Sequence, residues 1–387
     1  MRRFDQDPTD PAFVQDPYPF YDRLRAAGPL AWWSAYDMPV AAGHAAVAAL
    51  LRDRRLGRED PKPPPRPAHQ AAFWAVEDHS MLEAEPPRHT RLRGQVLRAF
   101  TSRALADLTP AVEALADRLT AELRDGEDLL DAVARPLPVR TIARLLGVPE
   151  ADAPDLLRWS NAMVQMYQAG RTHAQETAAA AAATAFVAYL ETVLAQRATA
   201  PRDDLVSRLL AVEADGTLSR AELRATCILL LNAGHEATVH TLGNGVKGLI
   251  EAGLWGAPVT GALVEEVLRH DPPLHLFTRY AKDDVELFGH RFARGAQVGL
   301  LLGAANRDPA AYTEPARLNP DRGPGSPAHV AFGAGLHFCL GAPLARLEIR
   351  AALAALARRH PRLALSGRPL YAPIYHFHGL RTLHVRL

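Results

Sequence analysis

Cysteine and lysine are scarce in this sequence of 387 residues, and it has almost no net charge. Two cysteines, Cys227 and Cys339, exclude a disulfide scaffold and any zinc or iron–sulfur site built from several cysteines. The formal net charge of +1 excludes a global field that would recruit nucleic acid or an anionic membrane. Only three of the 44 Lys and Arg residues are lysines, which resembles GC-rich bacterial codon usage and says little about function.

Long apolar runs are also missing. The first 11 residues contain two arginines with no apolar stretch behind them, which excludes a secretory signal. No run reaches the about 18 apolar residues of a membrane span. Hydrophobic residues make up 48% and charged residues 22%, as in an ordinary globular protein. We therefore expect a soluble, cytoplasmic protein without nucleic-acid or membrane partners. We expect a monomer, because no coiled-coil pattern or apolar tail is evident.

The hydrophobic periodicity predicts a mainly α protein with a minor β part. Helices are expected at residues 17–26, 41–52, 86–202 and 344–359, with breaks in the third range at Thr109–Pro110, Gly126, 135–138 and 147–149. Strands are expected within 30–40 and 278–298, and a strand and turn at 371–387. Residues 61–67 contain five prolines and should form an extended, solvated segment, either a linker or a functional loop.

A second long helix is predicted after Ser219. Ser219 and Glu222 fit a capping box, in which each side chain satisfies a backbone donor of the other residue. The apolar pattern then continues to about Gly253, so we expect a helix about 50 Å long. A helix this long and this apolar is expected to cross the centre of a fold.

The most unusual segment runs from Phe332 to Gly341, with the sequence FGAGLHFCLG. Glycines at 333, 335 and 341 allow tight turns and a close approach to a flat group. Cys339 ends this loop just before a helix N-terminus, where backbone N–H groups and the helix dipole favour a thiolate. Such a thiolate is a soft metal ligand or a nucleophile, and haem iron is one metal bound in this way. A buried cysteine in a glycine turn is the alternative.

Residues 232–240 read NAGHEATVH, midway along the long helix. A zinc-protease site is excluded because His235 and His240 are five residues apart, about 140° around the helix. Gly234 costs about 1 kcal/mol relative to Ala, so it is expected either to make room for a ligand or to be a tolerated irregularity. Glu236 is a polar residue in an apolar helix. Further on, Glu266 and Arg269 are spaced to pair on one helix face.

In this order and spacing, the segments resemble the cytochrome P-450 family, the haem-thiolate monooxygenases, over nearly the whole chain. The loop 332–341 is similar to the family's Phe-x-x-Gly-x-x-x-Cys-x-Gly signature, Glu266 and Arg269 to its Glu-x-x-Arg pair, and residues 233–238 to its oxygen-binding groove. The resemblance implies a single P-450 domain over 1–387. Its β-rich part lies near 30–60 and 278–300 with the C-terminal turn, and its α-rich part at 86–272 and 303–360. A triangular prism of helices would hold haem b between the long helix and the cysteine-loop helix.

The resemblance also implies roles for individual residues. Cys339 would be the axial iron ligand, and Phe332 would shield the thiolate. Glu266, Arg269 and Arg322 would form a buried structural network. The two haem propionates need cationic partners. The positions that match the family's cofactor-binding residues, the propionate ligands first, are His89, Arg93, Arg279, His337, Phe332, Gly333 and Gly341.

One position departs from the family pattern. The groove usually ends in a threonine that helps to deliver protons to dioxygen, but here the segment is Ala233, Gly234, His235, Glu236, Ala237 and Thr238. Ala237 cannot donate or relay a proton, and Thr238 points about 100° away. A water or a substrate hydroxyl would take the role, or the chemistry does not need the usual proton delivery. The retained Glu236 argues against a variant that uses only peroxide.

The resemblance places the substrate pocket in four segments. They are the loop around Phe73 and Trp74, the long helix at Leu229, Asn232, Ala233 and Ala237, the segment with Leu274, His275, Leu276 and Phe277, and the turn at His376, Phe377 and His378. Most of these residues are apolar, which suits an apolar or aromatic substrate. Asn232 and His275 are predicted either to orient a polar substrate group or to bind water.

The chain has no flavin or iron–sulfur module, so electrons must come from a separate ferredoxin or flavodoxin and its reductase. Arg346 and Arg350 are predicted either to dock this donor or to form a solvated helix face. The leading hypothesis is a monooxygenase that uses dioxygen and two electrons to hydroxylate or epoxidise a small organic molecule of a natural-product or catabolic pathway. The alternatives are oxidative coupling or dehydrogenation, which Ala237 favours, a non-catalytic haem sensor or carrier, and a cysteine hydrolase with His337 as base.

Overall fold

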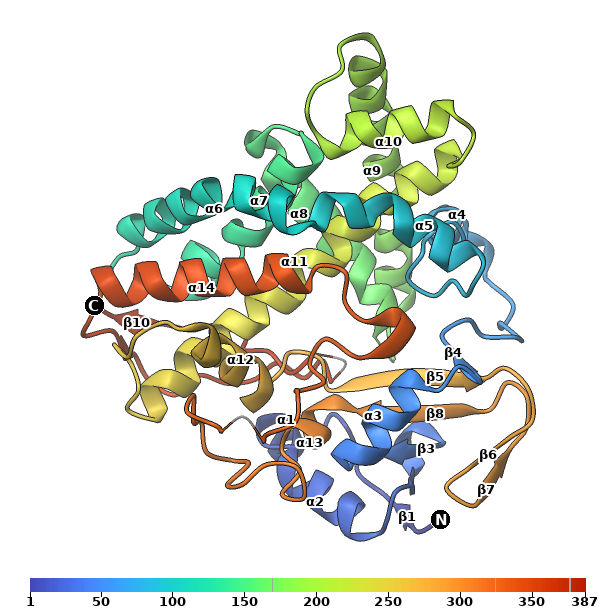
Figure 1. Ribbon diagram of the computed structural model, residues 1–387, viewed down its shortest axis with the longest axis vertical. Helices are drawn as coiled ribbons and strands as arrows, with labels where there is room; N and C mark the ends of the chain where they lie inside the picture. Colours follow the sequence, from blue (N-terminus) through green and yellow to red (C-terminus); the bar gives the residue numbers. More distant parts are fainter. Residues whose placement is uncertain (169, 324, 376) are drawn as a thin grey trace. The chain divides into compact units, whose positions relative to one another are not determined.

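The computed structural model describes residues 1–387 except 169, 324 and 376, and the side chains of residues 99 and 102 are also outside the description. The described chain forms two compact units. Unit 1 comprises Met1–Lys62, Glu113–Ala134 and Ala237–Leu387, and unit 2 comprises Pro63–Val112 and Arg135–Glu236. Figure 1 labels the helices and strands along the chain.

Unit 1 contains all the strands among the described residues. They are β1 (Arg3–Phe4), β2 (Ala31–Trp33), β3 (Met38–Ala41), β4 (Leu56–Gly57), β5 (Leu276–Ala281), β6 (Val285–Leu287), β7 (His290–Phe292), β8 (Gln297–Leu301), β9 (Ala364–Leu365) and β10 (Val385–Arg386). Its helices are α1 (Pro11–Gln15), α2 (Tyr18–Ala26), α3 (His44–Arg52), α12 (Gly261–His270), α13 (Leu302–Asn306) and α14 (Ala342–Arg359), with short turns of helix at Ser34–Tyr36, Leu130–Ala134 and Gly335–His337.

Among its described residues, unit 2 contains helices joined by turns and irregular segments, and no strand. Its helices are α4 (Ala71–Glu77), α5 (Arg88–Leu97), α7 (Pro136–Leu146), α8 (Ala153–Val164), α9 (His173–Thr199) and α10 (Leu205–Ala214), with 3-10 turns at Ala68–Gln70, Arg98–Phe100, Glu150–Asp152 and Gln165–Tyr167. Two helices have residues in both units, α6 (Ser102–Glu122) and α11 (Arg220–Glu251). The predicted fold class, mainly α with a minor β part, is confirmed.

The main sheet of unit 1 has six strands in the order β1-β2-β3-β8-β5-β4. The predicted segment 30–40 forms the antiparallel hairpin β2–β3. β5 and β8 pair antiparallel, with Phe277 opposite Leu300 and Arg279 opposite Val298. This sheet therefore fixes the positions of Phe277 and Arg279, two residues of the predicted site.

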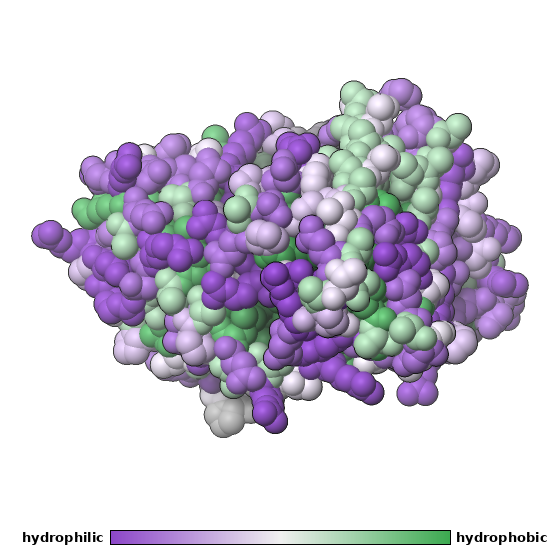
Figure 2. All heavy atoms as spheres, turned by 90° about the horizontal axis from the view of Figure 1, so that it is seen from above, coloured by the Kyte–Doolittle hydropathy of each residue, from purple (hydrophilic) through white to green (hydrophobic). Residues whose placement is uncertain are grey.

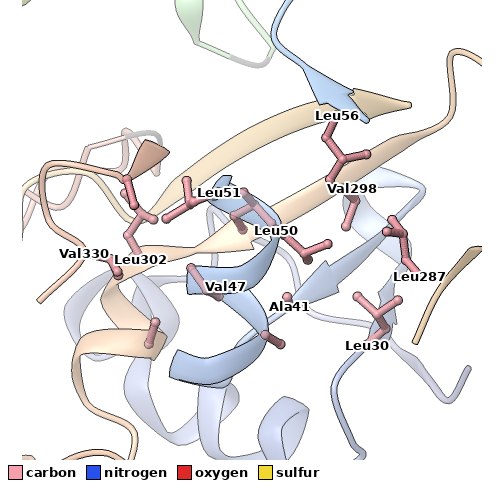
Figure 3. Close-up of a cluster of buried hydrophobic side chains, with 14 of the residues drawn as sticks. Leu30, Ala41, Val47, Leu50, Leu51, Leu56, Leu287, Val298, Leu302 and Val330 are labelled. Atoms are coloured by element: carbon pink, nitrogen blue, oxygen red, sulfur yellow. The ribbon is translucent and has the colours of Figure 1, made fainter. Parts of the chain in front are cut away.

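Helix α3 covers the sheet with an apolar face. Val47, Leu50 and Leu51 are 0–4% exposed, and they pack with Leu56 and Val298 in one buried cluster (Figure 3). The same cluster includes Val330 and Ala334, so it extends to the start of the predicted cysteine loop. Burial of such aliphatic side chains contributes about 1.5–3 kcal/mol each, which anchors the loop to a rigid sheet.

Helix α11 begins where the capping box predicts. The Ser219 N–H donates to the Glu222 carboxylate at 3.0 Å, and the Glu222 N–H donates to the Ser219 hydroxyl at 3.3 Å. The helix ends at Glu251, and Gly253 follows with a φ of +67°. The predicted long helix is thus confirmed with nearly the expected bounds.

Helix α9 is the one described helix that is long and apolar enough to cross a membrane by length and composition. Of its most apolar window, 44% is buried inside the structure. Ala183, Phe186, Leu190 and Leu194 are fully buried at 0% exposure and follow one face of the helix. This face is typical of a core helix. On the face that Figure 2 shows, hydrophilic and hydrophobic residues are interspersed.

Three local predictions were partly or wholly wrong. Residues 41–43 precede α3, because Ala41 pairs with Leu300 in the sheet and Gly43 has extended angles. No break occurs at Thr109–Pro110, since α6 runs through Pro110. A proline removes only one backbone donor, and the Thr109 hydroxyl adds a 2.8 Å bond to the Leu105 carbonyl. Residues 71–77 form a helix instead of a loop, as discussed below.

Candidate functional site

The loop that carries Cys339 is closed by its own backbone. The Cys339 N–H donates to the Phe332 carbonyl oxygen at 3.0 Å. Gly333 and Gly335 have φ of +68° and +72°, in the left-handed region that favours glycine. A Cβ on Gly335 would lie 2.7 Å from the Leu51 carbonyl oxygen of α3. Gly335 is therefore required both by its backbone angles and by the close packing of the loop on α3.

The Cys339 side chain is exposed in unit 1. Leu336 and Phe338, on the same loop, are large apolar residues that are 43% and 38% exposed. The Arg346 guanidinium lies 4.7 Å from the centre of the Phe332 ring. Its hydrogen bond to Glu265 is the main cause of the raised pKa of Arg346, and the charge at Cys339 adds to it. Arg346 thus places a positive charge near the sulfur, which favours the thiolate.

The second cysteine is different in kind. Cys227 is buried at 0% exposure, and burial raises the pKa of its thiol to about 12. It is a neutral core residue of unit 2. Cys339 is therefore the cysteine with the exposure and the nearby positive charge that a thiolate ligand needs.

Glu266, Arg269 and Arg322 meet in unit 1. Both Glu266 carboxylate oxygens lie 2.7 Å from Arg269 nitrogens and 3.0 Å from the Arg322 Nε. Arg269 also donates to the carbonyl oxygens of Asn306 and Pro315. Burial raises the pKa of Glu266, but the hydrogen bonds and charges of the two arginines outweigh burial and hold it below its ordinary value. This network ties α12 to the irregular segment before the cysteine loop.

The neighbouring Glu265 binds Arg346 with both oxygens, at 2.5 and 2.9 Å, and accepts from His329 at 3.2 Å. Burial opposes these partners, but they lower the pKa of Glu265 to about 2. Arg346 therefore has an acidic partner and an aromatic one, and it is 36% exposed. Arg350 is also exposed, so both alternatives, donor docking and a solvated face, stay predictions.

Strand β5 faces the cysteine loop with Phe277. A Cβ on Gly333 would lie 3.4 Å from the Phe277 ring, so this ring is in contact with the loop. Arg279 is two residues further along the strand and lies on the same face. Its side chain is 3% exposed and donates to the Thr278 carbonyl. His337, in the turn Gly335–His337, is half-buried. The structure thus brings Phe277, Arg279 and the loop together.

Leu274 and Phe377 also lie together in unit 1. They form an isolated antiparallel bridge, although they are a hundred residues apart in sequence. The Phe377 ring lies 5.5 Å from the His240 ring of α11. His376 is outside the described residues. Two of the predicted pocket segments are therefore adjacent in unit 1.

The structure argues against the prediction that His275 contacts substrate or water in the pocket. His275 is fully buried, and its Nδ1 lies 2.8 Å from the Tyr21 hydroxyl. Its Nε2 lies 3.8 Å from Asp271, and a Cβ on Gly303 would touch its ring. Burial lowers the pKa of His275 to about 4, so the ring is neutral. His275 belongs to the core because its neighbours are tyrosines and a carboxylate from distant parts of the chain.

Asp271 is the centre of this buried network and was missed in the sequence. Its carboxylate accepts from the Tyr18 hydroxyl at 2.8 Å, the Tyr371 hydroxyl at 2.6 Å and His378 Nδ1 at 2.9 Å. Burial raises the pKa of Asp271, but His378 and the other partners hold it well below its ordinary value. These three partners are 100 to 253 residues away in sequence, so no local pattern indicates them. His378, a predicted pocket residue, is 5% exposed and belongs to this network.

Unit 2 holds the other predicted cofactor residues on α5. His89 is 2% exposed, and Arg93 is half-buried one turn further on. Between them, Arg91 binds both oxygens of Glu222, at 2.5 and 3.1 Å. This contact lowers the pKa of Glu222 to about 2 and fixes α5 to the start of α11. His89 and Arg93 are thus held on one face of an anchored helix.

The groove residues lie along α11, with Ala233 exposed and Ala237 half-buried one turn later. The space beside Gly234 is filled by protein, which corrects the prediction of room for a ligand. A Cβ on Gly234 would lie 2.6 Å from the Ile142 Cδ1 atom of α7. The glycine therefore allows α7 to pack closely against α11. Thr238 is 3% exposed and is turned toward the core, as the helix geometry predicts.

His235 and its polar partners form a second cluster that was not predicted. Its Nδ1 lies 2.9 Å from the Leu231 carbonyl oxygen and 3.3 Å from the Ser160 hydroxyl. Its Nε2 lies 3.0 Å from Asn161 Oδ1 and 3.6 Å from Glu236 Oε2. Only the failed zinc-protease spacing drew attention to His235, since its partners on α8 are about 75 residues away in sequence.

The remaining pocket residues lie on helices of unit 2. Phe73 and Trp74 are on α4, because the alanine-rich segment 71–77 has no glycine or proline to interrupt a helix. Phe73 is 1% exposed, while Trp74 donates to Gln70 at 2.8 Å. Asn232 is 3% exposed and its amide lies 3.8 Å from the Met163 sulfur. Leu229 is buried one turn earlier on the same helix.

The donor set of unit 1 fits a haem group. Cys339 is a soft ligand on a loop held close to the sheet. Because Gly341 has no Cβ, which would lie 4.0 Å from the Cys339 sulfur, no side chain at position 341 contacts the sulfur. Apolar Leu336 and Phe338 flank it, and Arg279 supplies a buried cation of the kind that propionates bind. A mainly helical fold with this loop and the Glu266 network defines the class of haem-thiolate proteins.

Comparison with known proteins identifies the family. The cytochrome P450 family model matches residues 256–361. The biotin biosynthesis cytochrome P450 of Bacillus subtilis strain 168 is 34% identical over 384 residues, which cover 96% of this chain and 96% of that protein. Cytochrome P450 monooxygenase PikC of Streptomyces venezuelae is 36% identical over 394 residues, which cover 97% and 92%. This chain belongs to the cytochrome P450 family.

Solved structures agree with this assignment. The structure of P450BioI in complex with an acyl carrier protein ligated to hexadec-9Z-enoic acid superposes with a TM-score of 0.91 and 34% identity. The superposition covers 98% of this chain and 100% of that chain. The protein is therefore an oxidoreductase of the cytochrome P450 family, with relatives in biosynthetic pathways, and haem iron is the cofactor of its family.

Proposed function

We propose that this protein is a monooxygenase that uses dioxygen and two electrons to hydroxylate or epoxidise a small, largely apolar organic substrate. The observation that supports it most is the exposed Cys339 on a glycine-turned loop, whose Phe332 ring lies 4.7 Å from the Arg346 guanidinium. Bound haem supplies dioxygen activation and oxygen transfer. The chain's own residues bind the group, orient the substrate, and hold and deliver protons.

Cys339 would hold the haem iron through its thiolate. Its backbone bond to Phe332 and the left-handed angles of Gly333 and Gly335 hold the sulfur at the surface of the loop. Phe332 shields the thiolate while Arg346, stacked over the same ring, stabilises its negative charge. His89, Arg93, Arg279 and His337 are the proposed cationic partners of the propionates.

The substrate is proposed to contact Leu229, Asn232, Leu274, Phe277, Phe377 and the helix with Phe73 and Trp74. These side chains are mostly apolar, which favours an apolar or aromatic molecule. Asn232 is the polar member of the set, and its amide oxygen has no hydrogen-bond partner among the described residues. A hydroxyl group on the substrate would satisfy this oxygen.

Ala237 leaves the groove without the usual hydroxyl. We propose that a water or a substrate hydroxyl, together with Glu236, delivers protons in its place. The same alanine favours a second candidate function, oxidative coupling or dehydrogenation without oxygen insertion. The two functions differ in their products, because only the first adds an oxygen atom to the substrate.

The proposal includes separate protein partners. The chain is proposed to act as a single domain, as a cytoplasmic monomer, with electrons from a ferredoxin or flavodoxin and its reductase. The similar P450BioI structure holds a carrier-bound fatty acid. The substrate of this protein is therefore to be sought among carrier-bound molecules as well as free ones.

The test is a titration of the purified holoenzyme with aromatics, terpenoids, steroids, macrolactones and acyl chains, free and carrier-bound. We expect one class to shift the haem absorption band toward high spin, and turnover with surrogate redox partners to yield an oxygenated product. A product without added oxygen would favour coupling or dehydrogenation. Binding without any oxygen consumption would contradict an enzymatic role, and a purified protein unable to bind haem would contradict the whole proposal.

A further inference from the structure

The polar cluster around His235 lies within unit 2, on the buried side of α11 and on α8. The imidazole is 1% exposed, and Ser160 is fully buried. Asn161, which lies 3.0 Å from His235 Nε2, is exposed. The cluster therefore connects a buried imidazole to the surface of the protein through one amide side chain.

The contacts of the ring favour its doubly protonated form. The Leu231 carbonyl oxygen can only accept, so Nδ1 carries a hydrogen at 2.9 Å from it. Asn161 presents its Oδ1 to Nε2, and this oxygen also accepts. A ring that donates from both nitrogens is an imidazolium. With the Asn161 amide turned by 180°, its NH2 group would donate instead, and Nε2 would be unprotonated.

A carboxylate lies next to the same nitrogen. Glu236 Oε2 is 3.6 Å from His235 Nε2, and the Glu236 side chain is 17% exposed, against 2% for His235. When His235 is protonated the two groups form an ion pair, whose opposite charges favour the charged forms while burial opposes them. Glu236 is also the acidic residue of the groove that lacks the usual threonine hydroxyl at Ala237.

We propose that His235 is a positioning residue that holds a proton for Glu236 and renews it from the surface at Asn161. This inference rests on the proposed function, because a supply of protons to the groove matters only if the enzyme activates dioxygen. It names a route for those protons that does not need a hydroxyl at position 237.

The step is a proton transfer and involves no electron. The Nε2–H bond of His235 breaks and an O–H bond forms at Glu236 Oε2, after a side-chain movement or one bridging water closes the 3.6 Å gap. His235 is then a neutral imidazole. It regains a proton at Nε2 from a hydronium ion that reaches the ring beside the exposed Asn161 and leaves as water, and Asn161 Oδ1 accepts the restored N–H.

A purely structural role is the alternative, in which His235 only fastens α11 to α8. The groups that face the ring within unit 2 are Leu231 and Glu236 from α11 and Ser160 and Asn161 from α8. Of these four groups only Glu236 is titratable. The proton-holding role requires that the titration of His235 depends on Glu236, and a structural pair at 3.6 Å would couple in the same way, so the pH profile of product formation separates the two roles.

The first test follows the imidazole itself. Histidine-labelled holoenzyme, reduced and bound to carbon monoxide so that it is diamagnetic, is titrated by NMR, with His235 assigned from its loss in His235→Gln. We expect the His235 signal to titrate and its midpoint to fall by about one pH unit or more in Glu236→Gln. An unchanged midpoint in that variant would overturn the proposal.

The second test measures product formed per dioxygen consumed against pH. We expect His235→Gln to lower this ratio about tenfold or more and to flatten its pH profile. Asn161→Leu should do the same, and Asn161→Asp, which keeps an acceptor, should retain the profile. The control His79→Gln removes a histidine of unit 2 outside the cluster and should behave as wild type.

A lower ratio with an unchanged pH profile in both His235→Gln and Asn161→Leu would indicate a structural role and overturn the proposal. Failure of the proposed function is seen separately, because it would appear as loss of haem binding or of oxygen activation in the wild type. The NMR titration with Glu236→Gln tests the His235 proposal whether or not a substrate is known.

Discussion

The Cys339 N–H donates to the carbonyl oxygen of Phe332 at 3.0 Å and so closes the loop that displays the thiol. The bond joins the two ends of the signature segment and fixes the sulfur relative to the Phe332 ring. Because Arg346 stacks on that ring, one backbone bond orients the thiol relative to the Phe332 ring and to the guanidinium that lies on it.

Gly335→Ala should loosen this loop. The substitution forces an alanine to φ of +72° and places its Cβ 2.7 Å from the Leu51 carbonyl oxygen, a rigid backbone atom. Strain of this kind costs about 1–3 kcal/mol. We expect a lower thermal midpoint and a lower fraction of protein that retains haem, measured by the absorbance ratio of haem to protein. Gly367→Ala is the matched control, because it has a φ of +90° but nothing near its Cβ. Equal effects on haem retention in both variants would contradict the role of the Leu51 contact.

Glu266→Gln should destabilise unit 1 strongly. Glu266 and Arg269 are 4% and 3% exposed, so the substitution leaves two guanidinium groups without their buried carboxylate. Removal of one partner of a buried pair costs about 3–5 kcal/mol. Urea unfolding of the purified variant measures this loss. Glu314→Gln, which breaks an exposed pair with Arg317, should cost under about 1 kcal/mol. A similar small loss for Glu266→Gln would show that the network is dispensable.

The pair of Arg91 and Glu222 predicts an acid-sensitive contribution to stability. The pKa of Glu222 is lowered to about 2 in the folded protein, against about 4.3 in an unfolded chain. The carboxylate therefore stabilises the fold above about pH 4.3, and this contribution disappears as the pH falls toward 2. Because Arg91 is 39% exposed, we expect only about 1–2 kcal/mol. The difference in unfolding free energy between wild type and Glu222→Gln should follow this window. A difference that is constant with pH would contradict it.

Ala237→Thr should improve oxygen use with substrates that lack a hydroxyl group. The new hydroxyl can donate and accept a proton in the groove, which alanine cannot. We expect the product formed per dioxygen consumed to rise several-fold, which is less than the about 10²–10⁴-fold that general acid–base catalysis contributes to a rate. Ala237→Val has nearly the same shape without the hydroxyl and should give no such gain. Equal ratios for the two variants would mean that the missing hydroxyl does not limit the reaction.

Local patterns in the sequence were sufficient for much of the fold. The capping box at Ser219 and the glycines around Cys339 express preferences that act over a few residues, and the structure contains both features. The pairing of Glu266 with Arg269 follows from their spacing on one helix. Arg322 also binds Glu266. The family resemblance indicated this contact, whereas the spacing in the sequence did not.

The errors concern contacts between distant segments. Gly234 was interpreted as space for a ligand, but Ile142 of another helix fills that space. His275 was assigned to the pocket, but its partner Tyr21 is 254 residues away. The polar partners of His235 and Asp271 were missed for the same reason. Which side chain fills a gap, or satisfies a buried polar atom, depends on tertiary packing that periodicity does not encode.

The most direct test of the central claim is the absorption spectrum of the reduced, carbon monoxide-bound protein in Cys339→Ser. We predict that this variant loses the thiolate-type band, whereas Cys227→Ser retains it, because Cys227 is a buried thiol with its pKa raised to about 12. If Cys339→Ser folds, binds haem and keeps the wild-type band, Cys339 is not the iron ligand and the assignment of the site is wrong.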